Sequence, residues 1–135
     1  MSANESASAE NGIRTLPSPV SFAETVARIT SALQSHGVKI FATIDQQAEA
    51  RSAGIEMLPV ILILFGNPKA GTPLMVAQPT AALDLPLKAA IWQSASAEVF
   101  VSFNTAAYII ARHALPPALE ANIAAAEKLI TNALA

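Results

Sequence analysis

The stretch from Leu58 to Met75, LPVILILFGNPKAGTPLM, contains the spacing that most resembles a chemical motif. Four residues separate Gly66 from Gly71, as in a phosphate-binding loop. Such a loop needs Lys and then Ser or Thr directly after its second glycine, where this chain has Thr72 and Pro73. The motif is incomplete, so we do not expect a nucleotide site.

The same loop brings together three polar residues, Asn67, Lys69 and Thr72, that are candidates for contact with a ligand. Loops carry binding residues more often than buried elements do. A structural interpretation explains the same residues: a turn at Asn67-Pro68, a permissive backbone at Gly71, and a short helix over PLMVA capped by Thr72.

Asp45 ends the stretch FATID and precedes QQAEARSA, which has helical character. Its carboxylate is a candidate ligand contact or general base. A carboxylate at this position also accepts backbone N–H groups as the N-cap of a helix, and we favour that role.

Arg112 and His113 come near the end of a helix expected over residues 105–114, one turn after Tyr108 and Ile109. Such a patch could bind an anion or a carboxylate. Cationic groups also stabilise the C-terminal end of a helix without binding anything. An enzyme would need these two residues, Asp45, Asn67 and Lys69 to meet in one pocket as an acid–base site.

The segment ALDLPLK alternates leucines with polar residues. If it is extended, Leu83, Leu85 and Leu87 face the core, and Asp84 lies on the same side as Lys88. We expect a surface ion pair between these two residues, which contributes about 0–1 kcal/mol.

Composition excludes several classes of function. The net charge is −2, and the eight Lys and Arg residues are scattered, so nucleic acid is not an expected partner. The chain has no cysteine and its two histidines are far apart, so we expect no metal and no cofactor. No apolar run approaches the ~20 residues of a membrane span, and no signal peptide is apparent, so we expect a cytoplasmic protein without a membrane partner.

The patterns indicate an α+β fold with two layers: a mainly antiparallel sheet of about four to five strands, with helices packed on one face. A short edge strand is expected in RTLPSPV, and the apolar run LPVILILF is expected inside the sheet. Residues 1–13 read as a disordered tail and residues 14–115 as the α+β domain. Residues 116–135 read as a C-terminal helix packed on the domain or at a dimer interface.

Five blocks of the sequence together resemble a bacterial family, the domain of unknown function family 302. They are FATID, LILFGNPKAGTPLM, PTAALDLPLKAAIW, VFVSFN and ARHAL. The resemblance covers roughly residues 15–115. It implies a fold similar to one half of the TATA-binding protein, frequent dimers and no established activity; likeness of fold does not imply DNA binding.

This chain departs from the family pattern at several positions. Gln46 stands where His is common, and Val60 and Ile61 stand where Thr-Glu is common. Ala106 or Ala107 replaces a usual proline. A site that used that His and Glu is therefore not expected here.

These observations favour a non-catalytic homodimer that binds a small ligand, such as an anion, or a protein partner. Two alternatives stay open: an enzyme with the modest acid–base site described above, and a purely structural oligomerisation module.

Overall fold

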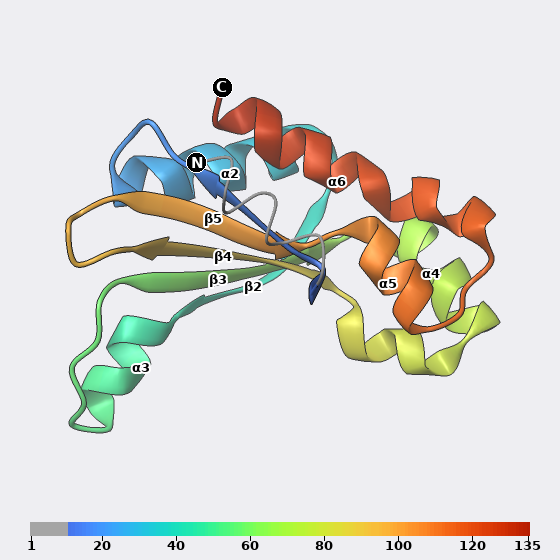
Figure 1. Ribbon diagram of the computed structural model, residues 1–135, viewed down its shortest axis with the longest axis horizontal. Helices are drawn as coiled ribbons and strands as arrows, with labels where there is room; N and C mark the ends of the chain where they lie inside the picture. The colour runs from blue at the N-terminus through green and yellow to red at the C-terminus, as the bar shows by residue number, and fades with distance from the viewer. Residues whose placement is uncertain (1–10) are drawn as a thin grey trace.

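The computed structural model describes residues 11–135, which form a five-stranded antiparallel sheet with helices (Figure 1). The strands lie in the order β1-β5-β4-β3-β2, and every neighbouring pair is antiparallel. The strands are β1 (Ile13–Pro17), β2 (Lys39–Asp45), β3 (Val60–Gly66), β4 (Leu87–Gln93) and β5 (Val99–Asn104). The predicted α+β class, the edge strand and the inner position of LPVILILF are confirmed.

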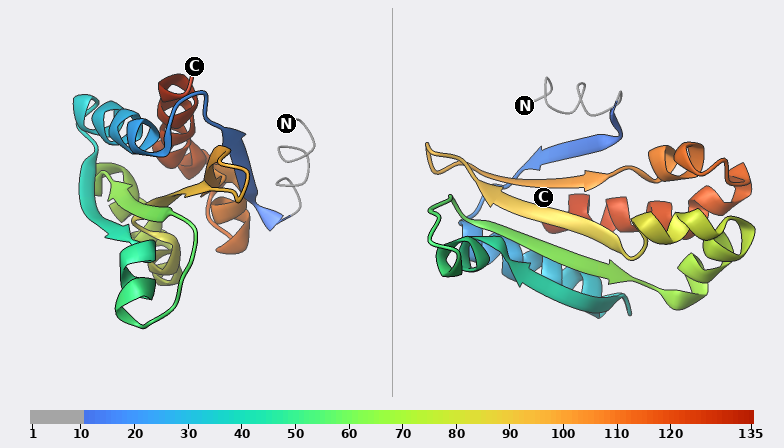
Figure 2. Two further views of the ribbon diagram at one scale, coloured as in Figure 1. Left: turned by 90° about the vertical axis from the view of Figure 1, so that its left-hand side faces the viewer. Right: turned by 90° about the horizontal axis from the view of Figure 1, so that it is seen from below.

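Two long helices, α2 (Phe22–Ser35) and α6 (Glu120–Ala133), cover one face of the sheet (Figures 1 and 2). The shorter helical segments are α3 (Gln46–Ser52), α4 (Pro68–Ala77), η1 (Pro79–Asp84), α5 (Ala106–Arg112) and η2 (Pro117–Leu119). Across residues 11–135, no helix combines the length and apolar character that crossing a membrane requires.

Local signals in the sequence fix the limits of α2. Ser21 is the N-cap, and its hydroxyl accepts the backbone N–H of Glu24 at 3.2 Å. Beyond the C-terminal end, Gly37 adopts φ +72°, a left-handed conformation that suits glycine. Both limits of α2 therefore follow from residue types within one turn of its ends.

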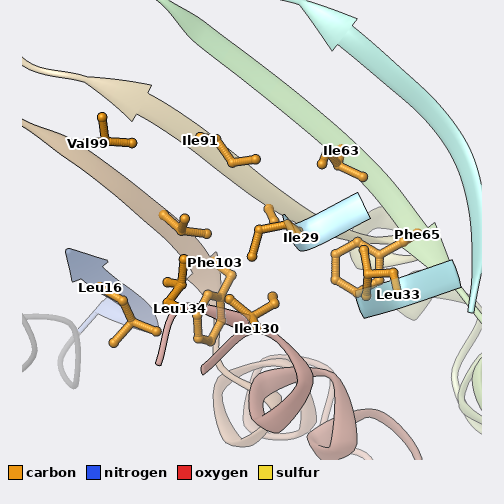
Figure 3. Packing of buried hydrophobic residues seen from close by; sticks show 12 residues of the cluster. Leu16, Ile29, Leu33, Ile63, Phe65, Ile91, Val99, Phe103, Ile130 and Leu134 are labelled. Atoms are coloured by element: carbon orange, nitrogen blue, oxygen red, sulfur yellow. The ribbon is translucent and has the colours of Figure 1, made fainter. Parts of the chain in front are cut away.

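The main core lies between the sheet and these two helices (Figure 3). In β3, Ile63 and Phe65 point toward the helices and are buried, whereas Leu62 and Leu64 alternate onto the other face and are half-buried. The side chains that meet them include Ile29, Leu33, Ile91, Val101, Phe103 and Ile130. The sheet is therefore packed on one face, and β3 is not fully buried on both faces.

A second core cluster lies at the end of the sheet where β3 and β5 terminate. It joins α4, η1, α5 and α6, which pack together there in Figure 1. Its buried members are Leu74, Ala81, Ala106, Ile109, Ile110, Leu115 and Ile123. The C-terminal helix thus packs on the rest of the chain.

Helix α4 corrects one sequence expectation. It begins at Pro68, and its N-cap is Asn67, whose side-chain oxygen accepts the backbone N–H of Lys69 at 2.9 Å. Thr72 lies inside the helix instead of capping it, because Asn67 satisfies the first turn and Pro68 favours a helix start.

The expected N-terminal tail, residues 1–13, falls mostly outside the described residues. Within the part of this tail that the structure describes, Ile13 belongs to β1. Gly12 has φ +78° and is buried against Tyr108, and its carbonyl accepts the N–H of Thr105 at 2.8 Å.

Candidate functional site

The residues proposed as an acid–base site do not meet in one place. Strand pairing sets Asp45 opposite Ile61, whereas Lys39 is opposite Gly66. Asp45 therefore lies at one end of β3 and the loop that starts at Asn67 lies at the other, about 17 Å away along the strand.

Asp45 acts as a helix cap. Its Oδ1 accepts the backbone N–H of Ala48 at 2.9 Å, at the start of α3, and the residue is exposed. The favoured structural role of this carboxylate is thus present.

Lys69 and Thr72 are exposed residues of α4, close to the exposed cap Asn67. The structure gives the side chains of Lys69 and Thr72 no hydrogen bond or ion pair within residues 11–135. They lie at the same end of the sheet as α5, which follows β5, because β3 and β5 run in the same direction.

Arg112 and His113 both contact the carboxylate of Asp84, which belongs to η1. Arg112 Nη1 lies 3.1 Å from each Asp84 carboxylate oxygen, and His113 Nε2 lies 2.5 Å from Asp84 Oδ2. The other ring nitrogen of His113, Nδ1, lies 3.0 Å from the hydroxyl of Thr80. We call Thr80, Asp84, Arg112 and His113 the η1–α5 cluster.

Burial differs within this cluster. Asp84 and His113 are each 7% exposed, whereas the side chain of Arg112 is 47% exposed and Thr80 is exposed. The buried imidazole thus links a buried carboxylate to the hydroxyl of an exposed residue. The blocks PTAALDLPLK and ARHAL, which carry the family resemblance, meet here.

The predicted ion pair between Asp84 and Lys88 is wrong. Residues 79–84 coil into the 3-10 helix η1, so the expected alternation fails and Leu83 is 70% exposed. Lys88 Nζ instead lies 3.3 Å from the carbonyl oxygen of Pro86. Sequence reasoning missed Asp84 and Thr80 as partners of His113, because the contacts span 29 and 33 residues.

The second feature of interest is the sheet face that lacks α2 and α6, which we call the open face. In the right-hand view of Figure 2, its strands lie in front of α6. Residues paired across strands share a face, so the register assigns its members. They include Thr15, Ala42, Ile44, Leu62, Leu64, Ala90, Trp92, Phe100 and Ser102.

The open face is mostly apolar, although Lys88 lies on it opposite Leu64, with Nζ 3.3 Å from the carbonyl oxygen of Pro86. Its other polar side chains named above are bonded to one another. Trp92 Nε1 donates to Ser102 Oγ at 2.9 Å, and the hydroxyls of Thr15 and Ser102 are 2.8 Å apart. The rings of Trp92 and Phe100 stack with centroids 4.6 Å apart. Most of its polar and aromatic members come from the stretches KAAIWQ and EVFVSF, which form β4 and β5.

Exposed apolar side chains flank this face near α3, on the side of the sheet away from α2 and α6 (Figure 1). Ile55 is 62% exposed and Leu58 is about half exposed. Phe41, also about half exposed, lies at the other end of β3, beside Gly66. A shallow hollow of about 540 Å³ lies between α3 and the segment after it, lined in part by Arg51, Ile55 and Leu58.

Known proteins share this architecture and parts of this sequence. The family model described as "Domain of unknown function DUF302" matches residues 14–135. The chain belongs to this family. The match extends past the resemblance at residues 15–115 and includes α6.

A solved DUF302 structure has the same fold. The crystal structure of an uncharacterized conserved DUF302 protein from Bacillus stearothermophilus matches with a TM-score of 0.77 and 17% sequence identity. The match covers 91% of this chain and 95% of that one.

Curated relatives share more sequence but only part of their length. A protein of Brucella suis named "Fluoride-specific ion channel FluC 1" is 39% identical over 106 residues, or 78% of this chain and 42% of that protein. A Brucella abortus protein of the same name is 39% identical over 106 residues, or 78% of this chain and 39% of that protein. The chain thus spans about two fifths of these relatives.

Proposed function

We propose that this DUF302 chain is a homodimeric binding module in which the open face of one copy packs against the open face of a second. The observation that carries the proposal is an apolar sheet face without helices, opposite a face that is fully packed.

The chemistry of the face supports a second copy as its occupant. A two-fold interface buries the same patch on both partners, so the patch must complement itself. The apolar side chains of Leu62 and Leu64 meet this condition. Burying Thr15, Trp92 and Ser102 also leaves their bonded polar groups satisfied.

The sheet face alone is smaller than a typical stable interface, so residues beside it must contribute. Five strands, spaced by about 4.8 Å and each about 20 Å long, give the sheet a flat area of about 500 Å². This area leaves out the surface that the side chains add. Stable interfaces bury about 800 Å² of accessible surface per partner. The exposed side chains of Ile55 and Leu58 beside the face would add to the buried area.

Light scattering coupled to size-exclusion chromatography tests the proposal with a matched pair of variants. Leu64→Glu places a charge on the open face, next to its cross-strand neighbour Lys88, which helps the single copy to tolerate it. Val76→Glu places the same charge on α4, where Val76 is 77% exposed.

We expect the wild type and Val76→Glu to be dimers at micromolar concentration and Leu64→Glu to be a monomer with unchanged circular dichroism. A wild type that is monomeric throughout this range contradicts the proposal. A Leu64→Glu variant that stays fully dimeric contradicts the assignment of the face.

The partial match to proteins named as fluoride channels favours a second candidate function. We propose that a domain of this kind also serves as an accessory module to a membrane channel. In the Brucella relatives, the similar region shares one polypeptide with roughly three fifths that this chain does not match.

Fluoride efflux from liposomes tests this candidate. The full-length Brucella suis relative is compared with a version that lacks the matched 106 residues. The proposal expects efflux from both and measurable binding of the present chain to the shortened version. Loss of all efflux from folded shortened protein, or no binding at micromolar concentration, contradicts an accessory role.

A further inference from the structure

The η1–α5 cluster joins the hydroxyl of an exposed residue, an imidazole and a carboxylate in one hydrogen-bonded series. This is the relationship between a nucleophile, its base and the group that orients the base. The open face has no part in this series, so a chemical role for the cluster goes beyond the proposed function and does not depend on it.

Asp84 determines which nitrogen of His113 carries the proton. An ionised carboxylate only accepts hydrogen bonds, and Arg112 donates to both of its oxygens. When His113 is neutral, the nitrogen that carries the proton beside this carboxylate is therefore Nε2, which lies 2.5 Å from Asp84 Oδ2.

In a neutral imidazole with Nε2 protonated, Nδ1 is a bare acceptor. Thr80 Oγ1 lies 3.0 Å from this Nδ1, and in this tautomer the hydroxyl donates to the ring. That is the arrangement in which a histidine removes the proton of an attacking hydroxyl.

The three residues differ in their exposure to solvent. Asp84 and His113 are shielded from water, whereas Thr80 is exposed. A small electrophile can thus approach Thr80 from solvent, whereas His113 behind it is shielded.

We propose that Thr80 is a nucleophile, with His113 as its general base and Asp84 as a positioning residue, and that it accepts acyl groups from small activated esters. With p-nitrophenyl acetate, Thr80 Oγ1 forms a bond to the acetyl carbon as its proton moves to His113 Nδ1. The bond from that carbon to the p-nitrophenolate oxygen breaks, and the proton then passes from His113 to the departing phenolate or to water. The product is O-acetyl-Thr80.

The test incubates the full chain with p-nitrophenyl acetate and follows acetylation of each peptide by mass spectrometry. Thr72 is the internal control, because it is also exposed and has no hydrogen-bonded histidine. General-base assistance contributes about 100-fold or more, so we expect Thr80 to be acetylated at least about tenfold faster than Thr72. A smaller ratio overturns the proposal.

Variants identify the base. In folded His113→Gln, Thr80 should react at the rate of Thr72, whereas Thr80→Ser should keep a fast reaction at the same position. Undiminished acetylation of Thr80 in folded His113→Gln overturns the proposal. If His113→Gln does not fold, the test uses the wild type alone. The acetylation rate of Thr80 relative to Thr72 should then be at least about tenfold in the folded protein and should fall to about one in urea.

Discussion

At the scale of residues, Asp84 holds together two parts of the chain that are distant in sequence. Its carboxylate contacts Arg112 and His113 at the end of α5, and these contacts lie beside the second core cluster. A buried carboxylate is tolerated when charged and hydrogen-bonded partners surround it. The removal of its charge should therefore affect stability.

We predict that Asp84→Asn lowers the free energy of unfolding by about 1–3 kcal/mol, because the buried His113 and the guanidinium of Arg112 lose a charged acceptor. Asp45→Asn is the matched control: it makes the same change at an exposed N-cap, where Asn serves as well as Asp. Urea denaturation checks both. Equal stability of the two variants would contradict the role assigned to Asp84.

Gly12 offers a second prediction at this scale. A Cβ atom on Gly12 would come within 2.1 Å of the Tyr108 ring, and its φ is +78°. Gly12→Ala should therefore cost more than the about 1 kcal/mol that a left-handed alanine costs by itself.

Gly37→Ala is the control, since Gly37 has a similar φ of +72° and nothing within 4 Å of the added atom. Thermal unfolding of both variants measures how much more stability Gly12→Ala loses than Gly37→Ala, and this difference is the cost of the clash with Tyr108. If Gly12→Ala is no less stable than Gly37→Ala, the close packing of Gly12 on Tyr108 is not supported.

Sequence reasoning at this scale succeeded where the signal is local. The N-cap role of Asp45, which the sequence favoured, depends on residues within three positions. The partners of His113 could not be predicted, because the tertiary contact with Asp84 spans 29 residues and the coil of η1 overrides the alternating pattern.

At the scale of elements, α4 shows how two adjacent capping signals compete. Asn67 before Pro68 and Thr72 before Pro73 both satisfy the rule for a helix start. The structure uses the first, so Pro73 lies within the helix, in its first turns.

We predict that Asn67→Ala destabilises the protein by about 0.5–2 kcal/mol through loss of the cap, while Thr72→Ala changes stability by less than about 0.5 kcal/mol. Chemical denaturation of the two alanine variants measures the contrast. The reverse order would show that the helix starts after Thr72, as the sequence alone suggested.

The elements also show what residue types can predict. The prolines of RTLPSPV predicted an edge strand and the apolar run LPVILILF an inner strand, and β1 and β3 stand there. The uniformly apolar run in β3 could not reveal that Leu62 and Leu64 face away from the helices, because that depends on how many layers cover the sheet.

At the scale of the whole molecule, the two faces of the sheet differ. One is sealed by α2 and α6, and the other presents aliphatic and aromatic side chains from all of the inner strands. These side chains are half-buried in the single copy, apart from Phe100, which is 5% exposed. Apolar surface that no other element covers marks interaction sites. The central claim is that a second copy occupies this one.

Trp92 provides the most direct measurement, because it is the only tryptophan in the chain and lies on the open face. Acrylamide quenching of its fluorescence is measured during dilution, alongside the mass from light scattering. We predict that quenching rises as the dimer dissociates, with both transitions at the same protein concentration. A change in mass without a change in quenching, or a monomeric mass at every micromolar concentration, would contradict a dimer formed through the open face.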